Sequence, residues 1–192
     1  MKFVELEAHA GDYDAALESV RKLIEQEHAP DRAYTLLGAL LTDVVGDYEG
    51  AIDILSEALE RFPKSTGIIN NLAYTHLQQG DAASAERVLR RCPQDASADV
   101  AVTATRGLLS IVNGNLEEGL ALYTRAESLA RQRRDNHLAE IVLQKKHLEA
   151  AKAYWREGNR TAARQETRRG LAATTVSVYR EQLLKFVESL RA

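Results

Sequence analysis

The chain has 192 residues, 45% of them hydrophobic, with one cysteine and a formal net charge of −3, which excludes both a disordered chain and one stabilised by internal disulfides. Its apolar residues are rich in Ala and Leu and only three prolines interrupt them, which favours an all-α protein over a sheet-rich one. No run approaches the roughly 18 consecutive apolar residues of a membrane span, and no apolar signal segment follows Met1, so we expect a cytoplasmic protein.

The net charge conceals a division along the chain. Residues 1–124 contain 10 Lys and Arg against 20 Asp and Glu, a balance of −10, whereas residues 125–192 contain 15 against 8, a balance of +7. The sequence therefore predicts an acidic first part and a basic last third.

A glycine followed by Asp or Asn recurs along the chain at intervals of 35, 34, 34 and 44 residues. Glycine readily adopts the left-handed conformation that ends one helix, and an Asp or Asn side chain accepts hydrogen bonds from the first amides of the next. Each pair is therefore predicted to form a helix–turn–helix corner, and Glu118, three residues after Asn115, completes the spacing of a capping box. The pairs are Gly11-Asp12, Gly46-Asp47, Gly80-Asp81, Gly114-Asn115 and Gly158-Asn159.

A small residue follows every Asp or Asn by four positions, and four positions later comes a second recurring residue that is mostly larger. Positions four apart share one side of a helix, so this pattern predicts a close helix crossing with a packed side chain beside it. The small residues are Ala16, Ala51, Ala85, Gly119 and Ala163, and their partners are Val20, Leu55, Leu89, Tyr123 and Thr167.

The helices that precede the corners carry a second pattern. Two of these helices share one spacing of apolar, small and aromatic positions, at i, i+3, i+4 and i+7. The residues are Tyr34, Leu37, Gly38 and Leu41 in one helix and Ile69, Leu72, Ala73 and His76 in the next. With the 34-residue period, the chain resembles a tetratricopeptide repeat protein over about residues 1–174. The resemblance implies a right-handed superhelical solenoid of five repeats, at about residues 1–30, 31–64, 65–98, 99–134 and 136–174.

The last segment, residues 175–192, is predicted to be an amphipathic helix that caps the final repeat, because Tyr179, Leu183 and Phe186 recur at steps of three and four. Two departures from the repeat pattern carry further predictions. One extra residue between Gly38 and Ala51 predicts a bulge or a longer turn in the first helix of that repeat. The 44-residue interval predicts two long helices, over residues 123–131 and 138–155, joined by a turn at residues 133–136.

The resemblance implies a concave surface lined by the first helix of each repeat, so residues of these helices that the packing pattern does not need are candidate partner contacts. We take Asn71 as the strongest, because an amide both donates and accepts hydrogen bonds, whereas Asn70 also reads as a helix-start residue. Trp155 reads equally as an interface anchor and as a residue packed under the terminal helix. The candidates are Asn70, Asn71, Tyr74, Leu77, Gln78, Thr105, Leu108, Ile111, Lys145, Lys152, Trp155 and Arg156, and the same subtraction leaves Arg32, Thr35, Leu36, Ala39 and Asp43 in the second repeat.

One ligand class of the family is excluded by the sequence. The clamp that holds the acidic tails of chaperones needs cations and asparagines at set positions of three consecutive repeats, and only Asn71 matches it. The positions before it hold Thr35 and Ala39, and those after it hold Ala101 and Thr105. We therefore expect a protein or peptide partner other than a chaperone C-terminal tail.

Catalytic and metal chemistry find little support. The five histidines have no ligand spacing, His76 occupies an aromatic packing slot, and Cys92 before Pro93 is expected to be a buried structural thiol. We therefore predict no enzyme activity, no metal and no cofactor, and a non-catalytic protein–protein interaction module. Two alternatives stay open: RNA or DNA binding through the basic last third, and head-to-tail self-assembly between the acidic and basic parts.

Overall fold

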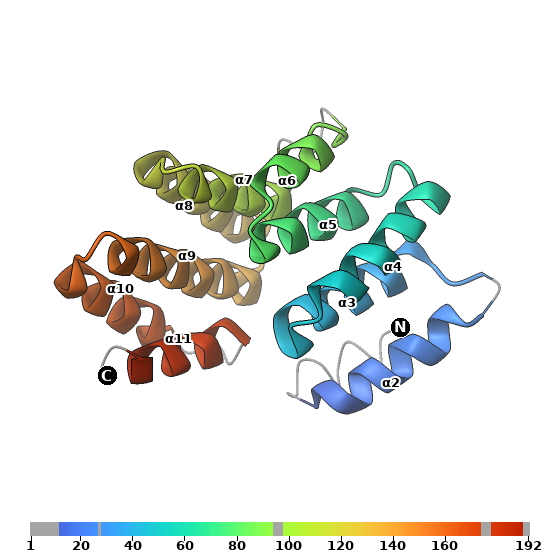
Figure 1. The fold of residues 1–192 in the computed structure, drawn as a ribbon, viewed down its shortest axis with the longest axis horizontal. Coiled ribbons are helices and arrows are strands. Elements are labelled where there is room, and N and C mark those ends of the chain that lie inside the picture. Colours follow the sequence, from blue (N-terminus) through green and yellow to red (C-terminus); the bar gives the residue numbers. More distant parts are fainter. Residues whose placement is uncertain (1–11, 27, 94–97, 174–177, 190–192) are drawn as a thin grey trace. The chain divides into compact units, whose positions relative to one another are not determined.

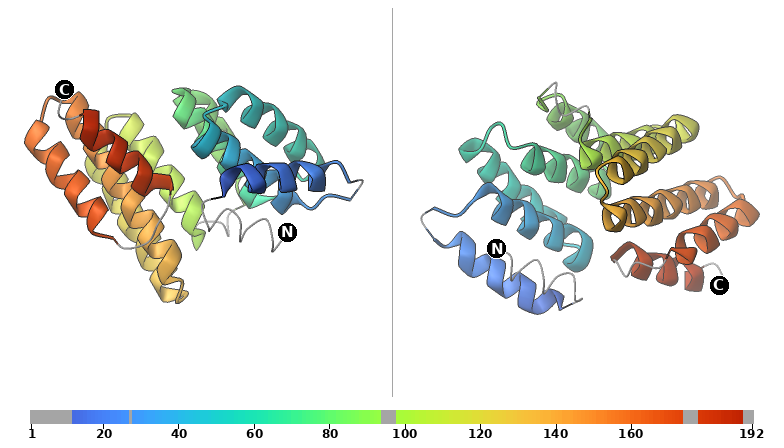
Figure 2. Two further views of the ribbon diagram at one scale, coloured as in Figure 1. Left: turned by 90° about the horizontal axis from the view of Figure 1, so that it is seen from below. Right: turned by 180° about the vertical axis from the view of Figure 1, so that it is seen from behind.

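The computed structural model describes residues 12–26, 28–93, 98–173 and 178–189, and every regular element in these ranges is a helix (Figure 1). The contacts divide the chain into two compact units, residues 1–96 and 97–192. Figure 2 shows the same helices from two other sides.

Unit 1 contains α2 (Tyr13–Ile24), α3 (Asp31–Leu40), the π-helix η1 (Leu41–Val45), α4 (Tyr48–Arg61), α5 (Thr66–Gln79) and α6 (Ala82–Leu89). Each helix packs on the next, and α3 also packs on α5, so the first helices of the second and third repeats are neighbours. The core forms two clusters, one that includes Leu37 and Ala51 and one that includes Leu55 and Ile69, and α3 contributes residues to both.

Unit 2 contains α7 (Val100–Val112), α8 (Leu116–Gln132), α9 (Asn136–Arg156), α10 (Arg160–Ala172) and α11 (Val178–Ser189). Here α7 packs on both α8 and α9, which again makes the first helices neighbours. The terminal helix α11 packs on α9 and α10 and buries Leu183 completely, so the predicted capping helix is confirmed.

The predicted corners are confirmed wherever the structure describes them. Gly46, Gly80, Gly114 and Gly158 have φ values of 78°, 94°, 87° and 77°, in the left-handed region. The side chains of Asp12, Asp47, Asp81 and Asn159 each accept a hydrogen bond from a backbone amide three residues later. Gly11 lies outside the described residues.

The capping box predicted at Asn115 is wrong, because its side chain accepts no amide hydrogen bond at the start of α8. The backbone still closes this corner, with the Asn115 amide donating to the carbonyl of Ser110 at 2.8 Å, as the amides of Asp81 and Asn159 do at theirs. The predicted crossings are confirmed, since all five small residues and all five partners from Val20 to Thr167 are buried.

The extra residue between Gly38 and Ala51 forms the π-helix η1, which widens the end of the first helix by one residue, so the predicted bulge is confirmed. The two long helices of the 44-residue interval are also present, as α8 and α9. Between them Arg134 takes the left-handed conformation that glycine takes elsewhere, with φ of 61°, and Asp135 caps α9 by accepting from the Leu138 amide.

Candidate partner-binding face

A row of polar side chains joins the two neighbouring first helices of unit 1. The Tyr74 hydroxyl of α5 donates to Asp43 Oδ1 of η1 at 2.6 Å, and Asn71 Nδ2 donates to the Thr35 carbonyl of α3 at 2.7 Å. Asn70 Nδ2 in turn donates to Asn71 Oδ1 at 3.1 Å. Because the bonds of Tyr74 and Asn71 cross from one repeat to the next, they fix these side chains in place and hold α3 and η1 against α5.

Two threonines that the sequence did not single out extend this row into the core. The Thr42 and Thr75 hydroxyl oxygens are 2.8 Å apart, and each also lies 2.8 Å from a backbone carbonyl one turn earlier, that of Gly38 or that of Asn71. Since a hydroxyl has one proton, one threonine donates to the other, which donates to its carbonyl. Threonine at these positions looked like an ordinary helix residue in the sequence. Their contact depends on the packing of η1, which contains Thr42, against α5, which contains Thr75.

Asn70 is not a helix-start residue, so that reading of the sequence is wrong. Helix α5 begins at Thr66, and the Ser65 hydroxyl accepts from the Ile68 amide at its start. Asn70 is only 6% exposed, and its Oδ1 has no hydrogen-bond partner among the described residues. A buried acceptor without a donor is uncommon in folded proteins, which makes Asn70 an unusual residue of this face.

The candidate residues divide by exposure into two groups. Six of them lie in the core, with exposures of 2–6%: Asn70, Tyr74, Leu77, Thr105, Leu108 and Ile111. Asn71, Gln78, Lys145, Lys152 and Trp155 are partly exposed and Arg156 is exposed. A ligand can therefore contact the six exposed or partly exposed residues directly, whereas the six buried residues support the surface on which these lie.

In unit 2 two of the candidates, Lys145 and Trp155, contact the capping helix α11. The Lys145 ammonium donates to the Tyr179 hydroxyl at 3.3 Å and lies 4.8 Å from the centre of its ring. Trp155 meets Phe186 of α11 edge to face, with ring centres 6.3 Å apart, and the Arg160 guanidinium lies 5.2 Å from the Trp155 ring. The structure thus shows the packing role that the sequence left open for Trp155.

Further along α9, Lys152 donates to Glu149 at 3.0 Å, and the Glu149 side chain is 7% exposed. A buried carboxylate without a partner lowers the stability of the fold, so Lys152 stabilises the structure by pairing with Glu149, besides any contact with a ligand. Arg156, one turn later, donates through Nε to the Lys152 carbonyl and keeps most of its guanidinium toward solvent.

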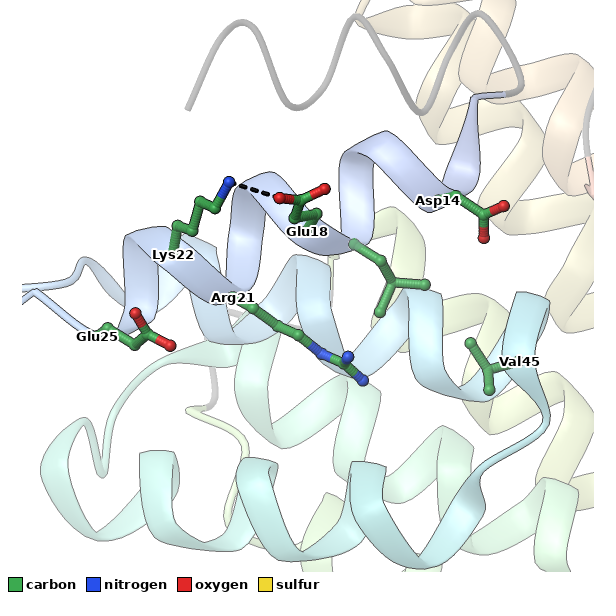
Figure 3. Close-up of a pocket in the computed structure, with 7 residues that line it drawn as sticks. Asp14, Glu18, Arg21, Lys22, Glu25 and Val45 are labelled. Atoms are coloured by element: carbon green, nitrogen blue, oxygen red, sulfur yellow. Dashed lines mark hydrogen bonds and ion pairs between the residues drawn. The ribbon is translucent and has the colours of Figure 1, made fainter.

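A hollow of about 490 Å³ lies beside α2, with Val45 at its far edge (Figure 3). Its wall carries acids and bases side by side, and the exposed Lys22 ammonium is 2.5 Å from Glu18. The hydrogen bond from Lys22 lowers the pKa of the Glu18 carboxyl, which moves it away from the neutral range that suits a general base. The hollow offers no arrangement of catalytic groups.

Elsewhere in the described ranges no cluster of three or more His, Cys, Asp or Glu side chains has the geometry to hold a metal ion. His76 is partly buried, and burial lowers its pKa below the ordinary value of a histidine. Cys92 is a free thiol that packs against the core around Leu55, and it is only partly buried rather than enclosed as expected. None of the described helices is both long and apolar enough to cross a membrane.

Comparison with known proteins bears out the repeat pattern. Two family models described as tetratricopeptide repeat match residues 2–66 and 45–109, which together span more than half of the chain. The sequence matches none of the curated proteins at a significant level.

Two solved structures share the fold. One is "MamA 41-end from Desulfovibrio magneticus RS-1", with 17% identity, coverage of 90% of this chain and 91% of that one, and a TM-score of 0.53. The other is "MamA RS-1 ArsTM double mutant", with 18% identity, coverage of 94% and 93%, and a TM-score of 0.52. At such identities the likeness concerns the fold alone. The matched repeats, together with their corners and crossings, show that this chain belongs to the tetratricopeptide repeat family.

Proposed function

We propose that this chain binds a protein or peptide partner along the first helices of its repeats and performs no catalysis itself. Repeats of this family are protein-interaction modules, so the chain is such a module at the coarse level that family membership supports.

The observation that carries the proposal is the polar row of unit 1. Over little more than one turn, α5 holds Asn70, Asn71 and Tyr74, and bonds from Asn71 and Tyr74 reach α3 and η1. Of these three, only Asn71 is partly exposed, so its amide is the one that can meet the alternating donors and acceptors of an extended peptide backbone, while Asn70 and Tyr74 hold it in place. Preorganised groups also lose little side-chain entropy on binding.

Among the described residues, Gln78 on α5 and Arg156 on α9 are the accessible candidates whose side chains make no hydrogen bond, ion pair or ring contact to another side chain. Gln78 supplies an amide for the peptide backbone, and Arg156 supplies a cation for an acidic side chain or a C-terminal carboxylate. Leu108, by contrast, is 2% exposed, so its truncation reports on stability rather than on binding.

The experiment selects ligands from a phage-displayed library of random linear peptides against the full chain and measures the best synthetic peptide by fluorescence anisotropy. The double variant Gln78→Ala with Arg156→Ala should bind that peptide at least tenfold more weakly, about 1.4 kcal/mol. The matched control, Ser56→Ala with Arg125→Ala, changes exposed residues of second helices and should bind as the parent does. Equal loss in both variants, or none in the first, contradicts the proposal.

A further inference from the structure

The capping helix α11 lies on α9 and α10 through three anchor side chains at positions i, i+4 and i+7 (Figure 1). Leu183 in the middle is completely buried, whereas Tyr179 and Phe186 on either side of it are partly exposed. Residues at this spacing share one side of a helix, and a helical peptide that binds in a groove of another protein uses the same spacing. The chain therefore holds α11 in the way that a groove holds a helical ligand.

The central anchor fills a socket that a glycine makes. A Cβ built on Gly170 of α10 would lie 2.7 Å from Leu183 Cδ1 and 3.0 Å from the Cβ of His147 on α9. Leu183 thus occupies the space that a side chain at Gly170 would take. A helix that binds in this groove needs an apolar side chain of about the size of leucine at its centre.

Aromatic contacts hold the two flanking anchors. The Lys145 ammonium of α9 donates to the Tyr179 hydroxyl at 3.3 Å and lies 4.8 Å from the centre of its ring. At the other end Phe186 meets Trp155 edge to face, with ring centres 6.3 Å apart. The hydroxyl makes tyrosine the matching residue at the first position, and the indole favours an aromatic ring at the third.

The walls of this groove are joined without α11. His147 Nδ1 of α9 is 2.7 Å from Glu166 of α10, both side chains are 12% exposed, and α9 and α10 pack on each other more extensively than either packs on α11. Within Val178–Ser189 only Leu183 is fully enclosed, and an isolated helix of 12 residues is marginal in water. We therefore expect α11 to leave the groove more readily than α9 and α10 separate.

Arg180 ties the beginning of α11 to the end of α10. Its guanidinium donates to the carbonyls of Leu171 and Ala173, both at 2.8 Å. Carbonyls at the end of a helix are also satisfied by water, so these bonds do not prevent α11 from leaving.

We propose that the groove between α9 and α10 binds an amphipathic helix of a partner protein, and that α11 occupies the groove when this partner is absent. The partner helix carries tyrosine, leucine and a second aromatic residue at i, i+4 and i+7, as α11 does. α11 is then an internal competitor, and the apparent affinity for the partner falls with the fraction of molecules whose groove is open.

The inference extends beyond the proposed function and does not rest on it. Among the described residues, neither Gln78 nor Arg156 makes a hydrogen bond, ion pair or ring contact with α11. The proposed peptide meets these two side chains, whereas the partner helix meets the socket at Gly170 and the aromatic contacts on either side of it.

The first test measures the fluorescence anisotropy of a fluorescein-labelled peptide with the sequence of residues 178–189, mixed with the full chain. Leu183→Asp places a charge in the apolar socket and should release α11, so this variant should bind the peptide at least about tenfold more tightly than the parent. Leu184→Asp is the matched control, because Leu184 is 49% exposed on the same helix, and it should bind as the parent does. Equal binding by the three chains, or none by the folded Leu183→Asp chain, overturns the proposal.

Trp155 is the only tryptophan of the chain and reports on the groove directly. Its emission should shift to longer wavelength in the Leu183→Asp chain and return when the unlabelled peptide is added. The same peptide carrying Leu183→Asp should not bind, and equal binding of that peptide overturns the proposal. Circular dichroism establishes that each variant chain is folded.

Hydrogen exchange of the parent chain tests the release of α11 without any variant. The amides of α11 should exchange at least about tenfold faster than those of α9 and α10, because α11 opens as a separate unit. Equal protection of the three helices overturns the proposal even if the Leu183→Asp chain does not fold.

Selection from phage-displayed random peptides against the Leu183→Asp chain, eluted with the peptide of residues 178–189, tests the chemistry of the partner. The eluted sequences should carry an aromatic residue, leucine and an aromatic residue at i, i+4 and i+7, and a different pattern overturns the proposal. A parent chain that forms a dimer in sedimentation velocity, dissociated by the free peptide, would instead show that α11 of a second copy is the occupant. Adding Gln78→Ala and Arg156→Ala to the Leu183→Asp chain should leave its binding of the labelled peptide unchanged, which separates this test from that of the proposed function.

Discussion

A close helix crossing of unit 2 joins α7 and α8 at Gly107 and Gly119, and adding one methyl group there tests the packing pattern directly. A Cβ placed on Gly119 would lie 2.6 Å from the Gly107 carbonyl oxygen and 3.1 Å from the Ile111 amide nitrogen. Both are backbone atoms, so a rotamer change does not relieve the overlap and the two helices must move apart.

Two effects of opposite sign set the size of the change. Forcing an extra carbon into a packed site costs about 1–3 kcal/mol, and contact with backbone puts this site in the upper part of that range. Alanine is favoured over glycine inside a helix by up to about 1 kcal/mol. We therefore expect Gly119→Ala to lower the free energy of unfolding by about 1–2 kcal/mol, and Tm by about 2–8 °C for a chain of this length.

Gly67 on α5 provides the control, because the three atoms nearest to a Cβ there would all belong to the side chain of Thr35, at 3.1 Å and beyond. Gly67→Ala makes the same chemical change with the same gain in helix propensity, and it should be within about 0.5 kcal/mol of the parent or more stable. Urea and thermal unfolding followed by circular dichroism at the helical band compare the two. If Gly119→Ala is as stable as Gly67→Ala, the close crossing does not constrain the fold.

Three further predictions concern bonds of the candidate face and its surroundings. Lys152→Met leaves the Glu149 carboxylate without its ammonium and should cost about 1–2 kcal/mol in urea unfolding, less than for a fully buried pair because Lys152 is 34% exposed, and adding Glu149→Gln should restore most of it. Burial lowers the pKa of His76, so below about pH 6.5 the unfolded chain binds a proton that the folded chain does not. The free energy of unfolding therefore decreases as the pH is lowered through this range. The variant His76→Phe should therefore lose less stability than the parent between about pH 7.5 and pH 5.5 in urea titrations, and parallel losses would show that His76 contributes nothing. Tyr74→Phe removes the hydroxyl that donates to Asp43 and should cost about 1–2 kcal/mol, and a double-mutant cycle with Asp43→Ala should show that the two losses are not additive.

Local features of the sequence predicted the frame of the fold well, because each depends on a few neighbouring residues. A glycine before Asp or Asn signals a corner through backbone conformation and capping, as Gly80 and Asp81 show. The residue inserted after Gly38 had to be absorbed somewhere before Ala51, and η1 absorbs it. The corner at Arg134 shows the limit, since its left-handed backbone has no glycine to announce it.

The candidate face was predicted less completely, because exposure depends on packing between repeats. Leu108 and Ile111 looked like spare residues of a first helix, yet both are 2–4% exposed. The sequence predicted that the Asn71 amide contacts a ligand, but in the structure its Nδ2 donates to the Thr35 carbonyl of the preceding repeat. Such contacts join residues 36 positions apart, so no local pattern could reveal them.

Hydrogen–deuterium exchange of the full chain, with and without the selected peptide, tests the central claim most directly. The account predicts slower exchange in the first helices, α5 and α9 above all, around Gln78 and Arg156, with the second helices α4 and α10 unchanged. Protection confined to α4 and α10, with the first helices unchanged, would contradict it.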